Sequence, residues 1–188
     1  VVGNLELTWL VPLSLIGTVC GWLYFVSEHA SEALSHAIGE RPVVKAMLAG
    51  LALAICGTVL PYTMFAGETQ ADVLMETYLT IPAGVLILTG LVKAMLTPAL
   101  INLGWRGGHF FPVIFSGVSL GYGLAILTGA DPVFCVAVCT ASTMGAVMRQ
   151  PGMVVGLLLM CFPLKGIVCM IIAAVIAAGI PLPKPLRK

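Results

Sequence analysis

The chain has 188 residues, of which 60% are hydrophobic and only 9% are charged, and its net charge is +1. A soluble domain carries roughly 25% charged residues, so this chain has too few charges to cover a surface in water. A net charge so close to zero also provides no basic field for a nucleic acid, and we expect the chain's main partner to be a lipid bilayer.

The N-terminal third predicts two long helices. Residues 5–38 form the first, whose apolar front part, residues 7–26, has the length of about 20 residues that a membrane span requires. Its back part, residues 27–38, is amphipathic, so we expect it to project into an aqueous zone. The stretch Gly39-Glu-Arg-Pro42 ends this helix, and a second helix follows over residues 43–59.

The middle of the chain predicts an interrupted arrangement. Residues 60–80 are polar, with a short amphipathic helix over residues 71–78. A third strong apolar segment, residues 81–103, contains Lys93 and Pro98, and residues 104–112 then break the helix within membrane-like sequence.

The later apolar segments are short, and several fall below the usual spanning length. Non-helical backbone at membrane depth persists only where protein buries it or where it lines a cavity. Transporter folds use such broken helices to build ion sites near the midplane. The sequence therefore predicts an all-α membrane protein with tilted and broken transmembrane helices and an ion or solute pathway. The short segments are residues 112–127, 132–148, 151–162 and 164–180.

Charged residues predict the orientation of the chain. Basic residues fall on alternating connections and acidic residues on the intervening ones, although Lys165 fits this pattern poorly. By the positive-inside rule we expect the basic connections and the C-terminus in the cytoplasm, in an integral multi-pass protein of a bacterial inner or plasma membrane. The basic residues are Arg41, Lys45, Arg106, Arg149, Lys184, Arg187 and Lys188, and the acidic residues are Glu68, Asp72, Glu76 and Asp131.

The cysteines do not predict a metal site. All six lie in apolar runs without a C-x-x-C pair, which indicates buried free thiols. We therefore expect no metal and no cofactor. The cysteines are Cys20, Cys56, Cys135, Cys139, Cys161 and Cys169.

The stretch from Gly107 to Pro112 is the leading candidate site. Gly107 and Gly108 would let the backbone turn tightly, and Pro112 suits the first turn of a helix, where a missing N–H is tolerated. The amides of the intervening residues would then be unpaired donors at the positive end of a helix dipole, which is an anion site made of backbone. An ordinary Gly-Gly turn between helices is equally compatible with this pattern. The intervening residues are His109, Phe110 and Phe111.

Two further features allow more than one interpretation. Lys93 is a costly charge within an apolar segment, so it could serve transport, pair with a neighbour or extend toward the interface. Gly121-Tyr122-Gly123 contains the triplet of potassium-channel filters, although Ser119-Leu120 precedes it. Packing of helices through small residues, including Gly117, is the favoured interpretation of these glycines.

The run from Lys93 to Pro112, followed by Ser116-Gly117, resembles the CLC family of chloride channels and proton–chloride antiporters. Gly108, Phe110 and Pro112 match the fixed positions of the family's G-x-F-x-P motif. Lys93 stands fifteen residues before Gly108, where the family usually has a basic residue. Arg149-Gln150-Pro151 resembles an arginine–x–proline junction between two later helices of the family.

The resemblance covers nearly the whole chain and implies the second of the family's two inverted repeats. Residues 1–188 would be one transmembrane domain that lacks the first repeat and the final helix, and that acts with the missing half. The amides of His109 and Phe110 would help to bind a central chloride or another small anion. The protein would be a homodimer in contact through residues 151–180, and it would not be an enzyme and would have no catalytic residue.

The sequence departs from the family pattern in several places, and these departures leave alternative functions open. The family's serine and gating glutamate belong to the first repeat, its tyrosine belongs to a final helix, and His109 and Phe111 are bulkier than usual. The main hypothesis is anion transport, as the C-terminal half of a channel or proton-coupled antiporter. The first alternative is a non-transporting membrane half-protein that keeps the fold. The second is a cation channel built on Gly121-Tyr122-Gly123.

Overall fold

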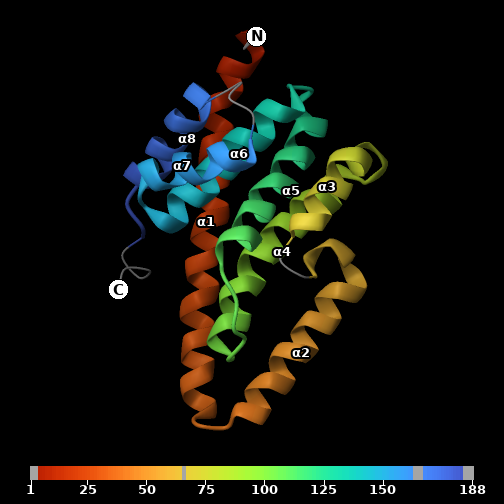
Figure 1. The fold of residues 1–188 in the computed structure, drawn as a ribbon, viewed down its shortest axis with the longest axis vertical. Helices are drawn as coiled ribbons and strands as arrows, with labels where there is room; N and C mark the ends of the chain where they lie inside the picture. Colours follow the sequence, from red (N-terminus) through yellow and green to blue (C-terminus); the bar gives the residue numbers. More distant parts are fainter. Residues whose placement is uncertain (1–3, 65–66, 163–166, 184–188) are drawn as a thin grey trace.

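The computed structural model describes residues 4–64, 67–162 and 167–183, and the regular structure within them is helical. Helix α1 (Asn4–Ile38) runs along the whole length of the molecule (Figure 1). At 1.5 Å per residue its 35 residues extend about 52 Å, well beyond a hydrocarbon core of about 30 Å. The predicted long first helix is therefore confirmed.

Helix α2 (Pro42–Val59) diverges from α1 after a short turn and runs back up the molecule (Figure 1). Ala49 is its one buried residue. Its large apolar side chains at every fourth position are exposed, and they share one face because residues four apart lie one above the other on a helix. Such a face suits contact with lipid or with another membrane segment. The residues of this face are Val43, Met47, Leu51, Ile55 and Val59.

The predicted polar interruption contains three short helical elements. They are η1 (Pro61–Thr63), α3 (Glu68–Thr77) and η2 (Tyr78–Thr80), so the amphipathic helix begins a few residues earlier than predicted. Leu74 on α3 is fully buried, whereas Val73 and Met75 beside it are exposed, as expected for an amphipathic helix. The stacked rings of Tyr78 and Tyr122, 4.5 Å apart, connect this region to α5.

Helices α4 (Ala83–Asn102), α5 (Phe110–Thr128) and α6 (Pro132–Met148) form the centre of the molecule. Residues 113–125 of α5 and 134–146 of α6 are all buried, and α1 and α4 pack against them. Asp131 begins α6 as its N-cap, since its Oδ1 accepts a hydrogen bond of 3.0 Å from the Val133 amide.

The glycines of α5 allow the central helices to approach closely. A Cβ on Gly117 would lie 2.4 Å from Thr140 Cα, and a Cβ on Gly121 would lie 2.5 Å from Val136 Cα. A Cβ on Gly123 would lie 2.7 Å from the side chain of Ile87. The Gly-Tyr-Gly triplet is thus helical and packs α5 against α6 and α4, whereas a filter needs carbonyls that face an ion. The cation-channel alternative is wrong for this structure.

Helices α7 (Pro151–Cys161) and α8 (Ile167–Gly179) complete the described chain. Arg149 ends α6 in the left-handed region, with a φ of 54°, and its Nη2 donates a hydrogen bond of 3.2 Å to the Ala178 carbonyl at the end of α8. This places a cation at the negative end of a helix dipole. Lys165, residues 164–166 of the last predicted segment, and Lys184, Arg187 and Lys188 lie outside the described residues.

Four helices are long and apolar enough to cross a membrane, namely α1, α2, α4 and α5, whereas α6, α7 and α8 are shorter. The predicted mixture of spanning and short helices is therefore confirmed for the described residues. The cysteines are free, as predicted, but they are not all buried, since Cys56 is half-buried and Cys161 at the end of α7 is exposed. The described residues include no cluster of three or more His, Cys, Asp or Glu that could hold a metal ion.

Candidate functional site

The candidate site begins where α4 ends. Gly104 has a φ of +98°, its amide donates to the Ile101 carbonyl, and the Trp105 amide donates to the Leu100 carbonyl, each over 3.0 Å. These two bonds form a Schellman motif, in which a glycine in the left-handed region ends the helix. The turn is therefore made by Gly104.

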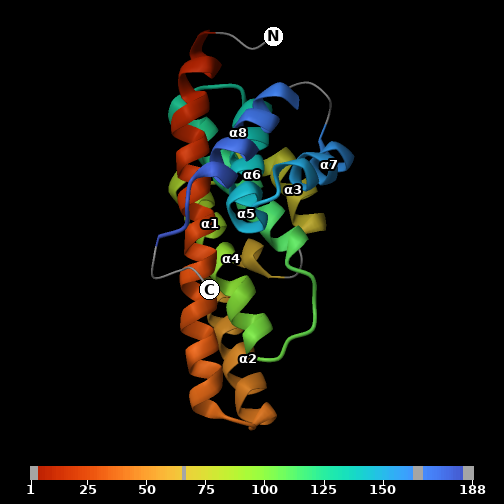
Figure 2. The same ribbon diagram turned by 90° about the vertical axis from the view of Figure 1, so that its left-hand side faces the viewer.

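Gly107 and Gly108 do not make the tight turn that the sequence predicted for them. Neither has a positive φ, and a Cβ on either residue would meet nothing within 4 Å. Their backbone conformation therefore does not require glycine. Figure 2 shows the loop of residues 105–109 leaving the lower end of α4 and running along the outside of the molecule to α5.

The N-terminus of α5 presents three unpaired amides. His109 is the N-cap, with a φ of −91°, and its carbonyl accepts the first bond of the helix from the Val113 amide over 3.2 Å. Pro112 has no N–H to donate. Within the described chain, the amides of His109, Phe110 and Phe111 have no acceptor, as the first turn of a helix requires. Since α5 has 19 residues, its dipole places a partial positive charge on these amides.

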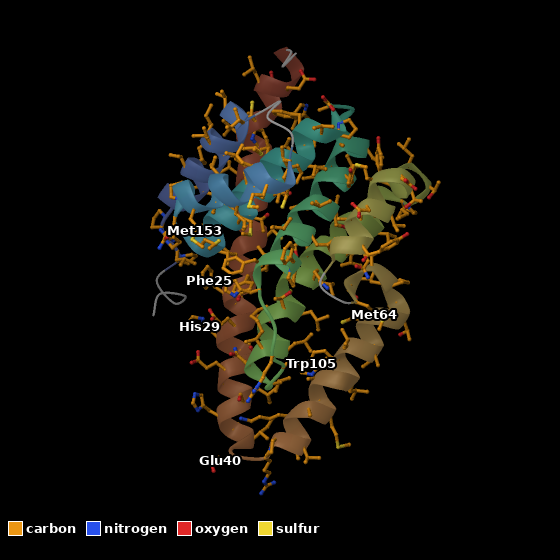
Figure 3. All side chains as sticks on the ribbon, in the orientation of Figure 1. Phe25, His29, Glu40, Met64, Trp105 and Met153 are labelled. Atoms are coloured by element: carbon orange, nitrogen blue, oxygen red, sulfur yellow. The ribbon has the colours of Figure 1, made fainter. Side chains whose placement is uncertain are left out.

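Aromatic rings pack beside these amides. The His109 ring stacks on the Phe110 ring, with centroids 4.4 Å apart, and lies 6.5 Å from the ring of Tyr24 on α1. Phe25 meets Tyr24 edge to face at 5.6 Å. In the view of Figure 3, Phe25 and His29 lie on one side of the loop and Met64 on the other, with Trp105 at the lower bend. The start of α5 is therefore held against the middle of α1.

Lys93 lies in the same region of the molecule. Only 4% of this residue is exposed, and its Nζ donates a hydrogen bond of 2.6 Å to the Thr63 carbonyl in η1. Its Nζ also lies 6.0 Å from the centre of the Phe115 ring. The Thr63 carbonyl stabilises the buried ammonium, so Lys93 pairs with a neighbour rather than extending to an interface.

A pocket of about 240 Å³ joins Lys93 to the loop. Two cations, Lys93 and Arg106, reach this pocket from different elements, and both Gly107 and Gly108 border it. The lack of a side chain at the two glycines leaves the pocket open. Its other lining residues are Leu53, Thr63, Leu96, Thr97, Leu100, Ile101, Trp105 and Pro112.

The sequence identified Lys93 and residues 107–112 as candidates, but it did not predict that Lys93 shares a pocket with Gly107, Gly108 and Pro112. Arg106 was assigned only an orienting role in the bilayer. Its position directly before the Gly-Gly pair was the signal that could have placed it at the site. Phe111 is nearly half exposed and lines a different cavity, of about 310 Å³, between α3 and α5.

A comparison with known families agrees with the resemblance noted in the sequence. Residues 2–181 match the family model described as voltage gated chloride channel. The match spans nearly all of the 188 residues. A search of curated proteins gave no match.

Proposed function

Because the chain belongs to the voltage gated chloride channel family, whose members are channels and transporters and not enzymes, we propose that it binds chloride or another small anion at the N-terminus of α5. The observation that carries this proposal is the set of three unpaired amides at residues 109–111, beside a pocket that two cations border. Backbone N–H groups and a helix dipole can replace part of the hydration shell of an anion.

The α5 dipole and the amides suit transport because they bind without a full counter-charge. A charge at a helix terminus is worth about 0.3–1 kcal/mol at exposed sites and up to about 2 kcal/mol when partly buried. Conduction requires an ion to be bound tightly enough to enter and weakly enough to leave. Lys93 and Arg106 would raise the local anion concentration beside this weak site.

The arrangement of the whole protein is part of the same proposal. We assign the chain to the second inverted repeat, one domain over residues 1–188, whose pathway is completed by a first-repeat half. The loops that carry basic residues face the cytoplasm in this arrangement. Residues 151–180 form the contact of a homodimer, which the exposed apolar side chains of Met160, Val168 and Val175 support.

Lys93→Met is expected to weaken anion transport without loss of folded protein. A lost positive charge near the anion costs about 1 kcal/mol, which is about fivefold in the half-saturating chloride concentration. Chloride flux into liposomes that contain the complete protein measures this. Lys45→Met, which removes a positive charge from α2 outside the pocket, serves as the control and is expected to leave flux unchanged.

Two results would contradict the proposal. A folded wild-type protein that moves no chloride would favour the non-transporting alternative. Equal flux through the Lys93→Met and Lys45→Met proteins would show that Lys93 only anchors η1 through the Thr63 carbonyl.

A further inference from the structure

Side-chain hydrogen bonds connect the middle of α1 to the last two turns of α4. The Ser27 hydroxyl donates to the Met95 carbonyl over 2.6 Å. Asn102 Nδ2 donates to the Glu28 carbonyl over 3.0 Å and to the Ser31 hydroxyl over 2.9 Å. We call these three bonds the α1 clasp. They join residues 68 to 74 positions apart in the sequence, and they lie directly before the Gly104 turn.

The end of α4 needs such support because Pro98 lies inside the helix. A proline removes the hydrogen bond to the carbonyl four residues earlier, here that of Ala94, and its ring crowds the preceding turn. In membrane helices, hydroxyl groups of neighbouring helices commonly bind carbonyls at such a gap. Ser27 binds the next carbonyl, that of Met95, and Asn102 is held on the far side of the proline. The clasp thus spans the weakened turn.

The same face of α1 also contacts the start of α5. Tyr24 lies three residues before Ser27, so the two side chains are neighbours on the helix surface. The Tyr24 ring lies 6.5 Å from the ring of His109, the N-cap of α5. One face of α1 therefore touches the chain on both sides of the 105–109 loop.

The 105–109 loop has little internal structure that would hold the end of α4 in place. Residues 106–108 make no backbone hydrogen bond within the described chain, and two of them are glycines. A direct bond between α4 and α5, from the Ser119 hydroxyl to the Leu86 carbonyl over 2.8 Å, lies well before Pro98 on α4. The bonds of Ser27 and Asn102 thus hold the part of α4 around and beyond Pro98 against α1.

We propose that Ser27 and Asn102 are positioning residues for the anion site at the N-terminus of α5. This inference rests on the proposed function, since it concerns the pocket beside the amides of residues 109–111. Binding constellations must keep their geometry within about 0.5 Å to retain affinity. Without the clasp, the α4 end moves about Pro98, and the pocket wall formed by Leu100, Ile101 and Arg106 shifts relative to the amides of α5.

Ser27→Ala tests this inference, with Ser119→Ala as its matched control. Each removes one serine hydroxyl that bonds a carbonyl of α4, but only Ser27 is part of the clasp. We expect the bromide Kd of the complete protein, measured by calorimetry, to rise about fivefold in Ser27→Ala and less than about twofold in Ser119→Ala. Ser27→Thr keeps the hydroxyl and is expected to bind like the wild type. Asn102→Leu should weaken binding as Ser27→Ala does.

A second measurement, the ratio of the bromide and nitrate affinities, distinguishes a change in the geometry of the site from a general loss of stability. We expect this ratio to change in Ser27→Ala at an unchanged melting temperature, whereas Ser119→Ala keeps the wild-type ratio. A wild type that binds bromide, together with a Ser27→Ala protein that binds it like Ser119→Ala, would overturn the clasp inference alone. A folded wild type that binds no bromide would overturn the proposed function and this inference with it.

Discussion

Replacement of Gly121 by alanine is expected to destabilise the folded protein strongly. The added Cβ would lie 2.5 Å from Val136 Cα and 2.8 Å from its backbone nitrogen, so α5 and α6 would have to separate. Overpacking of a core costs about 1–3 kcal/mol and occasionally more, and backbone atoms relax less readily than side chains. We expect a loss of monodisperse protein in detergent and a large drop in the apparent Tm of the remainder.

Gly50→Ala in α2 is the matched control for this substitution. It adds the same methyl group to a helical glycine, but nothing lies within 4 Å of it. Alanine is favoured over glycine in a helix by roughly 0.5–1 kcal/mol, so the control is expected to fold at least as well as the wild type. Equal stability of the two variants would contradict the close contact between α5 and α6. A folded Gly121→Ala protein with altered cation selectivity would revive the filter interpretation.

Replacement of His109 by proline is expected to remove most of the halide affinity, whereas replacement by alanine is expected to retain it. Proline deletes the amide hydrogen and breaks no hydrogen bond of the helix, because His109 is the N-cap and its amide has no acceptor in the described chain. A hydrogen bond to a charged group contributes about 1.5–3 kcal/mol, which is about tenfold or more in Kd. Alanine removes only the imidazole and keeps the donor.

Bromide calorimetry on the complete protein measures both variants, and the melting temperature identifies any general loss of folding. Because both substitutions are at residue 109, their comparison distinguishes the contribution of the backbone N–H from that of the imidazole. Equal affinities of the proline and alanine variants would show that the His109 amide does not bind the anion. A strong loss in the alanine variant alone would assign the binding to the imidazole.

Much of the helix pattern could be predicted from the sequence, because long apolar runs between glycines and prolines have few other ways to satisfy their backbone in lipid. The sixth helix lies over the predicted residues 132–148, since Asp131 and Pro132 begin it. The glycine that makes the turn after α4 was not predicted correctly. Gly104 follows the last turn of α4 at the position that a Schellman motif requires, yet the Gly107-Gly108 pair gave the more visible signal.

The assembly of the site could not be predicted, because it depends on contacts without a local period. The bond from Lys93 to the Thr63 carbonyl joins residues thirty positions apart, and the bond from Asn102 to the Glu28 carbonyl joins residues seventy-four apart. Sequence spacing predicts which residues share a helix face, but it does not predict which faces meet. The pocket between Lys93 and Arg106 arises only when η1, α4 and the loop pack together.

Anomalous scattering from crystals of the complete protein soaked in bromide tests the central claim most directly. We expect a bromide peak at the N-terminus of α5, within hydrogen-bonding distance of the His109 and Phe110 amides. That position requires no side-chain donor, because the amides point away from the helix and the dipole favours an anion there. Bromide bound only beside Lys93 or Arg106, with the three amides of α5 bonded to protein carbonyls, would show that the helix N-terminus is not the anion site.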